Sequence, residues 1–434
     1  MKKTILKTAA ACGLCLTLLA GSISASAAYN GGRQNAQAPG GQQTMLGGMQ
    51  RFGQMNGMFG GGMRQGGQMN AMFGGMQQGG MFAQTQNNAV SAASAGTIVT
   101  GTTTNSAASL TADEANATTI TMSDENSTVK IKEAGTYVVN GTCADGSITV
   151  TKGTTGVVLI LQNLNLTSTS GATLSINKGA EVKVIVSGSV TLTDAEDPAL
   201  EDASDDFDGA AIKVKSGASA YLTGTGTLTI NGSAKNGVKV SANEDDGSGS
   251  LVIDGATVNI TAANDAINAE YDLAILSGKL TISAGDDAIH ADRVLTIGAD
   301  GKGPTITVKS CTEGLEATVV NLSGGTVSVT SGDDGVNAAN SDGTYAALGY
   351  SSNVTGASVT VNAPRADGFD SNGNINLISG SATISSASNG GDAGIDYDGQ
   401  LYVSDGFVLN NSSGVTSMGA MGGMMGQMNG RMGR

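Results

Sequence analysis

The sequence predicts an all-β protein, a right-handed parallel β-helix (a solenoid) with disordered low-complexity tails. Three observations favour this fold. A short acidic phrase recurs along the chain at irregular intervals, and short alternating strands separate its copies without any pattern of helix length. The chain also has 66 Gly, 4 Pro and no Trp, which suits narrow stacked coils better than ordinary globular domains.

The recurring phrase consists of a carboxylate or amide, a small residue, an apolar residue and a further polar residue. Its clearest copies are residues 265–268, 287–290, 313–316, 334–337 and 367–370, and weaker copies lie at 208–213, 236–239 and 394–396. Counting from Asn236, the first positions lie between 21 and 33 residues apart. Between copies the chain alternates apolar and polar residues and turns at Gly, so each coil should hold about three short strands.

The ends of the chain differ from this central region. Residues 1–28 have Lys2 and Lys3, an apolar stretch and small residues before Ala28, which predicts an export signal. We expect residues 29–117 to be a disordered arm rich in Met, Gly, Gln and Asn that ends in a Ser/Thr linker. Residues 118–417 should form the β-helix, and residues 418–434 a second disordered Met/Gly tail. We expect no membrane span and a secreted, extracellular monomer that could stay associated with the cell surface.

Two cysteines remain after the export signal, Cys143 and Cys311. They should lie several coils apart, and coils stack ~4.8 Å apart. That separation exceeds the ~7 Å limit between the Cα atoms of a disulfide. We therefore expect two buried, unlinked thiols.

The charge of the chain limits its partners. It carries 37 Asp and Glu against 22 Lys and Arg, a net charge of −15. Nucleic acid is an unsuitable partner because neutralising phosphates requires a basic stripe. An acidic solenoid outside the cell favours divalent cations.

Stacking of the coils should align the copies of the phrase in two columns. The first residues of the copies form one column, which we call the first-position column: Asp208, Asn236, Asp265, Asp287, Glu313, Asp334 and Asp367. The last residues form the fourth-position column: Lys213, Lys239, Asn268, His290, Glu316, Asn337 and Asp370, with Asp396 next. Neighbouring carboxylates in such a column repel by roughly 1 kcal/mol in water and about 3 kcal/mol at an effective dielectric constant of 20. Hard cations with oxygen ligands would relieve this repulsion, so we expect Ca²⁺. The metal ligands that we expect are Asn264, Asp265, Asp286, Asp287, Glu313, Glu316, Asp333, Asp334, Asn337, Asp367 and Asp370.

Other polar residues beside these acids are candidates for contact with a bound ligand. They are Lys239, Asn268, His290, Arg293 and Arg365. A different interpretation of the columns is a solvated acidic face, because Asp-Gly is also common in turns.

Several motifs, in this order along the chain, carry a family resemblance. They lie at 135–141, 208–213, 226–230, 236–239, 285–289 and 332–336, and the resemblance covers residues 118 to 407. The chain resembles the bacterial secreted carbohydrate-binding parallel β-helix family, formerly a domain of unknown function. That resemblance implies binding of Ca²⁺ and of acidic plant polysaccharide such as polygalacturonate (pectin), and of cellulose. The Met/Gly arm, Glu313, Ala393 and His290 depart from the family pattern.

We expect a Ca²⁺-dependent carbohydrate-binding protein whose partner is an acidic glycan. Without Trp, stacking on a neutral crystalline sugar is less suited to the chain than cation-mediated binding. Two alternatives stay open. A Ca²⁺-dependent polysaccharide lyase would need a base beside the metal, and a structural cell-surface adhesin would act through its tails.

Overall fold

A computed structural model describes residues 94–197, 209–243, 249–340, 343–389 and 391–417. All of them belong to one compact unit, Met81–Arg434. The expected export signal, most of the arm and the C-terminal tail lie outside the described residues. Within the described part of the chain no helix is long and apolar enough to cross a membrane.

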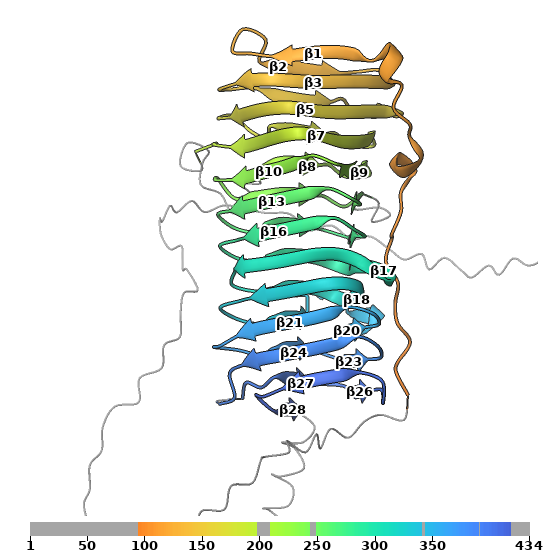
Figure 1. Ribbon diagram of the computed structural model, residues 1–434, viewed down its shortest axis with the longest axis vertical. Helices are drawn as coiled ribbons and strands as arrows, with labels where there is room; N and C mark the ends of the chain where they lie inside the picture. Colours follow the sequence, from red (N-terminus) through yellow and green to blue (C-terminus); the bar gives the residue numbers. More distant parts are fainter. Residues whose placement is uncertain (1–93, 198–208, 244–248, 341–342, 390, 418–434) are drawn as a thin grey trace, which may run out of the picture. The chain divides into compact units, whose positions relative to one another are not determined.

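The described chain is all-β and builds one large sheet in which every pairing is parallel. Each coil contributes a strand to three stacks, and each strand pairs with its equivalent on the next coil (Figure 1). The first stack contains β2 (Thr128–Ile131), β4 (Ser147–Val150), β6 (Leu174–Ile176), β8 (Ala210–Val214), β11 (Asn236–Val240), β14 (Ile267–Ala269), the start of β17 (Ile289–Ser310) and of β18 (Leu315–Thr330), β19 (Val336–Ala338), β22 (Phe369–Ser371), β25 (Ile395–Tyr397) and β28 (Val415–Ser417).

The second and third stacks follow in each coil. The second contains the first halves of β3 (Gly135–Cys143), β5 (Val157–Ser168) and β7 (Glu181–Asp194), then β9 (Ser219–Gly224), β12 (Ser250–Ile253), β15 (Asp272–Ile275), the middle of β17 and β18, β20 (Ser351–Val354), β23 (Asn374–Leu377) and β26 (Leu401–Val403). The third contains the second halves of β3, β5 and β7, then β10 (Thr227–Gly232), β13 (Thr257–Ala262), β16 (Lys279–Ser283), the ends of β17 and β18, β21 (Ser358–Ala363), β24 (Ser381–Ser386) and β27 (Val408–Asn411). β1 (Thr118–Met122) pairs with β3 at the N-terminal end.

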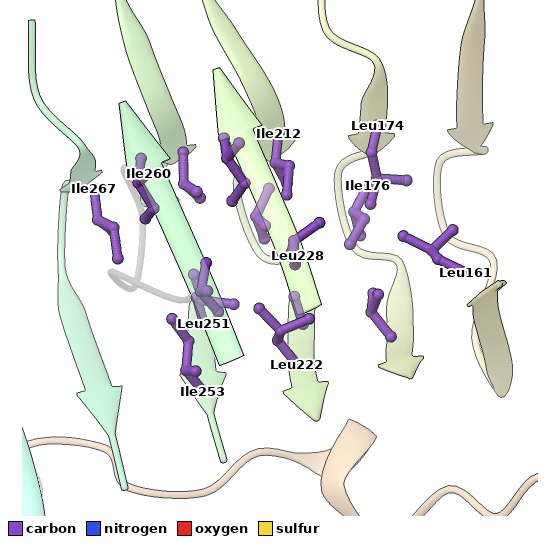
Figure 2. Close-up of a pocket in the computed structure, with 16 residues that line it drawn as sticks. Leu161, Leu174, Ile176, Ile212, Leu222, Leu228, Leu251, Ile253, Ile260 and Ile267 are labelled. Atoms are coloured by element: carbon purple, nitrogen blue, oxygen red, sulfur yellow. The ribbon is translucent and has the colours of Figure 1, made fainter. Parts of the chain in front are cut away.

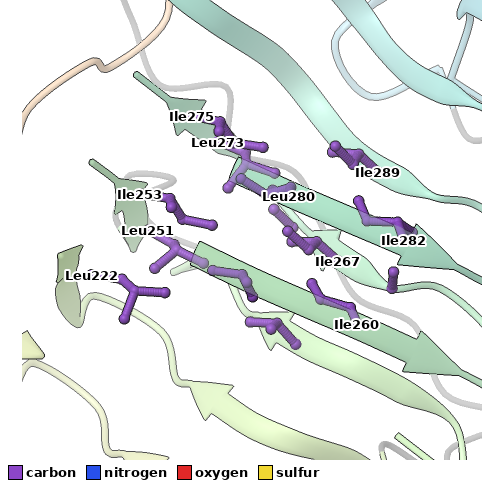
Figure 3. Packing of buried hydrophobic residues seen from close by; sticks show 14 of the residues in the cluster. Leu222, Leu251, Ile253, Ile260, Ile267, Leu273, Ile275, Leu280, Ile282 and Ile289 are labelled. Atoms are coloured by element: carbon purple, nitrogen blue, oxygen red, sulfur yellow. The ribbon is translucent and has the colours of Figure 1, made fainter. Parts of the chain in front are cut away.

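The core is a set of aliphatic ladders between the three stacks. Leu251 aligns with Leu273, and Ile260 with Ile282, so each side chain packs on its equivalent one coil away (Figure 3). Burial of β-branched and Leu side chains on every coil is the main stabilising term, at about 25 cal/mol per Å² of apolar surface. A void of about 20 Å³ between these ladders has apolar walls (Figure 2), and it is too small for a ligand. This void is therefore part of the core packing.

The expected linker differs from what the structure shows. Residues 94–117, which we call the strap, lie along the outer face of the second stack and contain two 3₁₀ turns, η1 (Ser106–Ser109) and η2 (Glu114–Asn116) (Figure 1). A third 3₁₀ turn, η3 (Ala346–Leu348), precedes β20. The strap N–H of Gly96 donates to Asn376 Oδ1 at 3.2 Å, and that of Asp113 to Thr136 Oγ1 at 2.8 Å. The strap thus connects the C-terminal coils to the N-terminal ones, and our expectation of disorder up to residue 117 is wrong for these residues.

The thiols of Cys143 and Cys311 are free, as expected. Cys143 is buried as expected, whereas Cys311 is partly exposed, so the expectation of burial is wrong for Cys311. Burial, with the charges of Asp287 and Glu313, raises the pKa of Cys311 to about 12, which makes it a poor nucleophile.

Candidate functional site

The fourth-position column forms in the register that the sequence predicts. The paired residues on successive coils of the first stack are Lys213, Lys239, Asn268, His290, Glu316, Asn337 and Asp370. Asp396 continues the column, because β22 pairs with β25 at Phe369 and Ile395. Alternation along a strand directs these side chains away from the apolar residues beside them. The column therefore lies on the outside of the first stack.

The first-position column lies in the turn that leads into the first stack. Its carboxylates accept backbone hydrogen bonds from the next coil: Asp265 Oδ1 accepts from the N–H of Asp287 at 3.1 Å, and Asp334 Oδ1 from that of Asp367 at 2.8 Å. Asp367 accepts from the N–H of Ala393 in the same way. One oxygen of each of these carboxylates thus connects neighbouring coils.

The second residue of the phrase is small for a steric reason. A Cβ placed on Gly335 would lie 2.7 Å from the backbone oxygen of Gly368, and one on Gly368 would lie 2.6 Å from that of Gly394. The coils approach closely here, so a large side chain does not fit. The same closeness brings the acidic side chains of successive coils together.

At the N-terminal end of the columns, a lysine and an amide connect the polar side chains of neighbouring coils. Lys239 Nζ donates to Asn268 Oδ1 at 2.6 Å and pairs with Glu270 at 2.9 Å. Asn268 Nδ2 in turn donates to Asp265 Oδ2 at 2.6 Å. Burial and the charge of Asp287 raise the pKa of Asp265, whose side chain is almost fully buried.

On the next coils, His290 neutralises neighbouring carboxylates. Its Nδ1 lies 3.2 Å from Asp287 Oδ2 and 3.2 Å from Glu316 Oε2, and its Nε2 lies 2.8 Å from Asp292 Oδ1. Burial alone would lower the pKa of His290, but these three hydrogen bonds raise it to about 12. The imidazolium therefore occupies the position between Asp287 and Glu316. These three side chains lie close enough to share a metal ion, but they already form an ion pair.

Glu313 and Asn337 form the next contact along the columns. Asn337 Nδ2 donates to Glu313 Oε2 at 2.9 Å. Burial, together with the charges of Glu316, Asp287 and Asp333, raises the pKa of Glu313 to about 7. The Oδ1 atom of Asn337 is buried and has no hydrogen-bond partner among the described residues.

The C-terminal end of the columns has no comparable cation among the residues that the structure describes. Oxygens of Asp367, Asp370 and Asp396 lie within 4.8 Å of one another. Burial and the neighbouring carboxylates raise the pKa of Asp367 to about 6, that of Asp370 to about 6 and that of Asp334 to about 8. In the described part of the chain, no basic side chain forms an ion pair with Asp367, Asp370 or Asp396. Among the described residues, backbone N–H groups donate to Asp367 and Asp396, but no cationic side chain pairs with any of the three carboxylates.

The doubled acids and the preceding amide lie at the edge of the columns. Asp286 and Asp333 are exposed, and Asn264 is half-buried with its Nδ2 donating to Asn236 Oδ1 at 3.3 Å. Burial of its carboxylate atoms and the charges of Asp265 and Glu316 raise the pKa of Asp286. These side chains lie next to the columns without belonging to either cluster of three.

The two candidate arginines do not join the columns. Arg293 pairs with both oxygens of the buried Asp272 at 2.6 Å and lies over the ring of Tyr271, 4.8 Å from its centroid. Arg365 is exposed in the turn after β21. Arg293 thus forms a structural ion pair with a residue of the second stack, and its contact with a ligand stays a prediction.

Two residues of the site were not among the ligands expected from the sequence. Asp292 binds His290 Nε2, and Asp396 completes the C-terminal cluster. Asp292 follows His290 by two residues on β17, so strand alternation places both on one face. Asp396 follows from extending the fourth-position column by one coil. Asp292 could have been found from strand alternation, whereas Asp396 was expected in the fourth-position column but not as a ligand.

Comparison with known proteins assigns this chain to a family. The sequence matches the model of the family described as carbohydrate-binding domain-containing protein over residues 125–393, which is more than half of the chain. Among solved structures, it is similar to the polysaccharide lyase-like protein from C. thermocellum, a gadolinium derivative. The two are 20% identical, the TM-score is 0.32, and the likeness covers 69% of this chain and 96% of that one. No curated protein matches the sequence. On the extent of the family match, this chain belongs to the carbohydrate-binding domain-containing family.

Proposed function

We propose that the protein is a secreted Ca²⁺-binding protein that binds acidic polysaccharide, with polygalacturonate as the main ligand. The observation that carries the proposal is the cluster of Asp367, Asp370 and Asp396, whose oxygens lie within 4.8 Å of one another without a basic partner among the described residues. A cation there would relieve the repulsion that raises the pKa values of Asp367 and Asp370.

The chemistry of the cluster favours Ca²⁺. Its side chains offer carboxylate oxygens, and Ca²⁺ takes about six to eight oxygen ligands at about 2.3–2.6 Å. Two oxygens on opposite sides of one such ion lie up to about 5 Å apart, which agrees with the spacing here. Three carboxylates leave positions on the ion for further oxygens. The carboxylate of a uronic acid can fill one of them, so the cation would connect two acidic partners that otherwise repel.

The fold and the location of the protein belong to the same proposal. The parallel register of all three stacks supports a right-handed parallel β-helix, because crossover connections between parallel strands are right-handed in about 98% of cases. The N-terminal sequence pattern supports export, where free Ca²⁺ is abundant enough to fill a site of modest affinity. We propose that the protein acts as a monomer.

Co-sedimentation with insoluble polygalacturonate tests this function. We expect the wild-type protein to sediment in millimolar Ca²⁺ and to stay in solution with a chelator. Asp370→Asn, which keeps the side-chain shape, should weaken binding at least tenfold, because it removes a charged ligand from the ion. Asp405→Asn changes an exposed carboxylate on the neighbouring coil and serves as the matched control. Binding that survives both the chelator and Asp370→Asn would contradict the proposal. Unsaturated sugar ends in the supernatant would identify a lyase instead.

A further inference from the structure

Lys239 and Asn268 face each other on adjacent coils of the first stack. β11 pairs with β14 in parallel, and the register places Lys239 directly opposite Asn268. Lys239 Nζ lies 2.6 Å from Asn268 Oδ1. Because a carbonyl bond is only about 1.2 Å long, Nζ also lies within about 4 Å of the amide carbon Cγ. The fold thus holds a primary amine beside the carbon of a side-chain amide.

Two carboxylates flank this pair, one beside each nitrogen. Glu270 Oε1 lies 2.9 Å from Lys239 Nζ, and Asp265 Oδ2 accepts a hydrogen bond from Asn268 Nδ2 at 2.6 Å. Asp265 is 4% exposed, and its Oδ1 accepts from the N–H of Asp287, which fixes the carboxylate against the amide. One carboxylate is therefore placed to take a proton from the amine, and the other to deliver one to the amide nitrogen.

The surroundings keep the pair in place and limit its contact with water. The Lys239 side chain is 15% exposed, although lysine side chains are mostly exposed in proteins. Its strand neighbours Val238 and Val240 belong to the core, as does Ile267 beside Asn268. Groups held in a reactive geometry behave as if present at effective molarities of up to about 10⁵–10⁸ M. An amine and an amide that do not react when free in water can therefore react here.

We propose that Lys239 and Asn268 form an isopeptide bond that cross-links two adjacent coils. The Nζ–Cγ bond forms and the Cγ–Nδ2 bond breaks. Nζ begins as an ammonium group and gives up two protons, and Nδ2 receives two and leaves as an ammonium ion. Glu270 accepts a proton from Nζ, and Asp265 passes one to Nδ2. The reaction is a transfer of an acyl group between two nitrogens, so it involves no change of oxidation state.

The cross-link would add a covalent connection to a fold whose coils otherwise associate through strand pairing and core packing. It joins residues 29 positions apart, on β11 and β14. The cluster of Asp367, Asp370 and Asp396 lies at β22 and β25, on other coils. The inference therefore does not depend on the proposed Ca²⁺ site or on a glycan.

Peptide mapping of the full-length protein by mass spectrometry tests the cross-link. Trypsin cleaves after Lys and Arg, so an unlinked chain yields residues 236–239 and 240–279 as separate peptides. An acylated Lys239 is not cleaved, and both linked residues then lie in one peptide. We expect the wild-type protein to yield residues 236–279 as a single peptide that lacks the mass of one NH₃. Lys239→Arg keeps the positive charge beside Glu270 but should yield only the two separate peptides, and Asn268→Ala should do the same.

A second reaction with the same loss of mass is distinguished by this map. Asn236 precedes Gly237, and cyclisation of an Asn-Gly pair also releases NH₃. That product would leave the bond after Lys239 open to trypsin, and it would persist in Lys239→Arg.

Two further variants test the assigned roles. Lys213→Arg changes the lysine on the preceding coil of the same column and should leave the linked fraction unchanged. Asp265→Asn removes the proton carrier beside Nδ2 and should lower the linked fraction at least about tenfold, and an unchanged fraction would contradict that role. Separate peptides of full mass from the wild-type protein, or a linked peptide that persists in Lys239→Arg, would overturn the inference.

Discussion

His290 determines how the N-terminal half of the columns is neutralised. It contacts three carboxylates, those of Asp287, Asp292 and Glu316, which raise its pKa to about 12. A raised pKa means that the stabilising contribution of the imidazolium is complete below about pH 6.5 and is lost only as the pH rises through the folded value near 12. At neutral pH His290 therefore acts as a built-in cation.

The protonation of His290 can be measured directly. The chain has a single His, so its imidazole resonances need no assignment against others. We expect nitrogen NMR shifts of an imidazolium at every pH from 5 to 9. A titration with a midpoint near 6.5 would show that the contacts to the three carboxylates do not form in solution.

Removing this cation should destabilise the fold. His290→Gln leaves Asp287 and Glu316 facing each other without a charge between them, and loss of one partner from a buried ion pair costs about 3–5 kcal/mol. Because the site is partly exposed, we expect the low end of that range in urea unfolding at pH 7. Glu316→Gln added to His290→Gln should recover part of the loss, since it removes one of the two opposing charges.

At the scale of elements, the strap holds the coils together through a ladder of buried amides. Asn353 Nδ2 donates to Asn321 Oδ1 at 3.0 Å, and Asn376 Nδ2 donates to Asn353 Oδ1 at 2.7 Å. The ends of the ladder bind the strap, at Gly96 N–H and the carbonyl of Val99. The strap thus completes the hydrogen bonds of this amide ladder, although Val99 lies more than 200 residues from Asn321 in the sequence.

Breaking the ladder in its middle should be costly. Asn353→Ala leaves amide groups of both neighbours unpaired, at about 1–3 kcal/mol for each buried unsatisfied group. We expect a loss of about 2–4 kcal/mol in urea unfolding, together with faster hydrogen exchange in the strap. The exposed Asn362→Ala, on β21, is the matched control and should change stability by less than about 0.5 kcal/mol.

The sequence predicted the repeated strands and the fourth-position column because both follow from a local repeat. Strand alternation and the spacing of the phrase place Asn268, His290 and Glu316 in register, as the structure confirms. The strap could not be predicted in this way. Its Ser/Thr/Ala composition is that of a linker, and the groups that order it lie on coils distant in sequence. The pairing of Arg293 with Asp272 could not be predicted for a related reason, since it depends on which side chains meet at the start of the second stack.

At the scale of the whole molecule, half-buried carboxylates connect stability to pH and to cations. Asp334, Glu313, Asp367 and Asp370 have pKa values raised to between about 6 and about 8. The folded state then binds more protons than the unfolded one, so stability is greatest below about pH 4 for these groups and falls as the pH rises to about 8. Bound Ca²⁺ would offset this loss where the acids are ionised.

Thermal unfolding in chelator should show this dependence. We expect a lower Tm at pH 8 than at pH 5. Ca²⁺ at a hundred times its Kd should stabilise the protein by about 2.7 kcal/mol at pH 8 and by less at pH 5, where protons compete for the site. A Tm that rises with pH in chelator would show that other groups dominate.

Calorimetric titration of Ca²⁺ into three proteins at pH 7.5 tests the central claim most directly. The claim is that the cation binds at Asp367, Asp370 and Asp396, whereas His290 occupies the equivalent position at Asp287 and Glu316. We predict that the wild-type protein binds Ca²⁺ with a Kd in the millimolar range or tighter, that Asp287→Asn retains this site, and that Asp370→Asn loses it. Binding that is lost in Asp287→Asn and retained in Asp370→Asn, or a wild-type protein that does not bind Ca²⁺, would contradict the account.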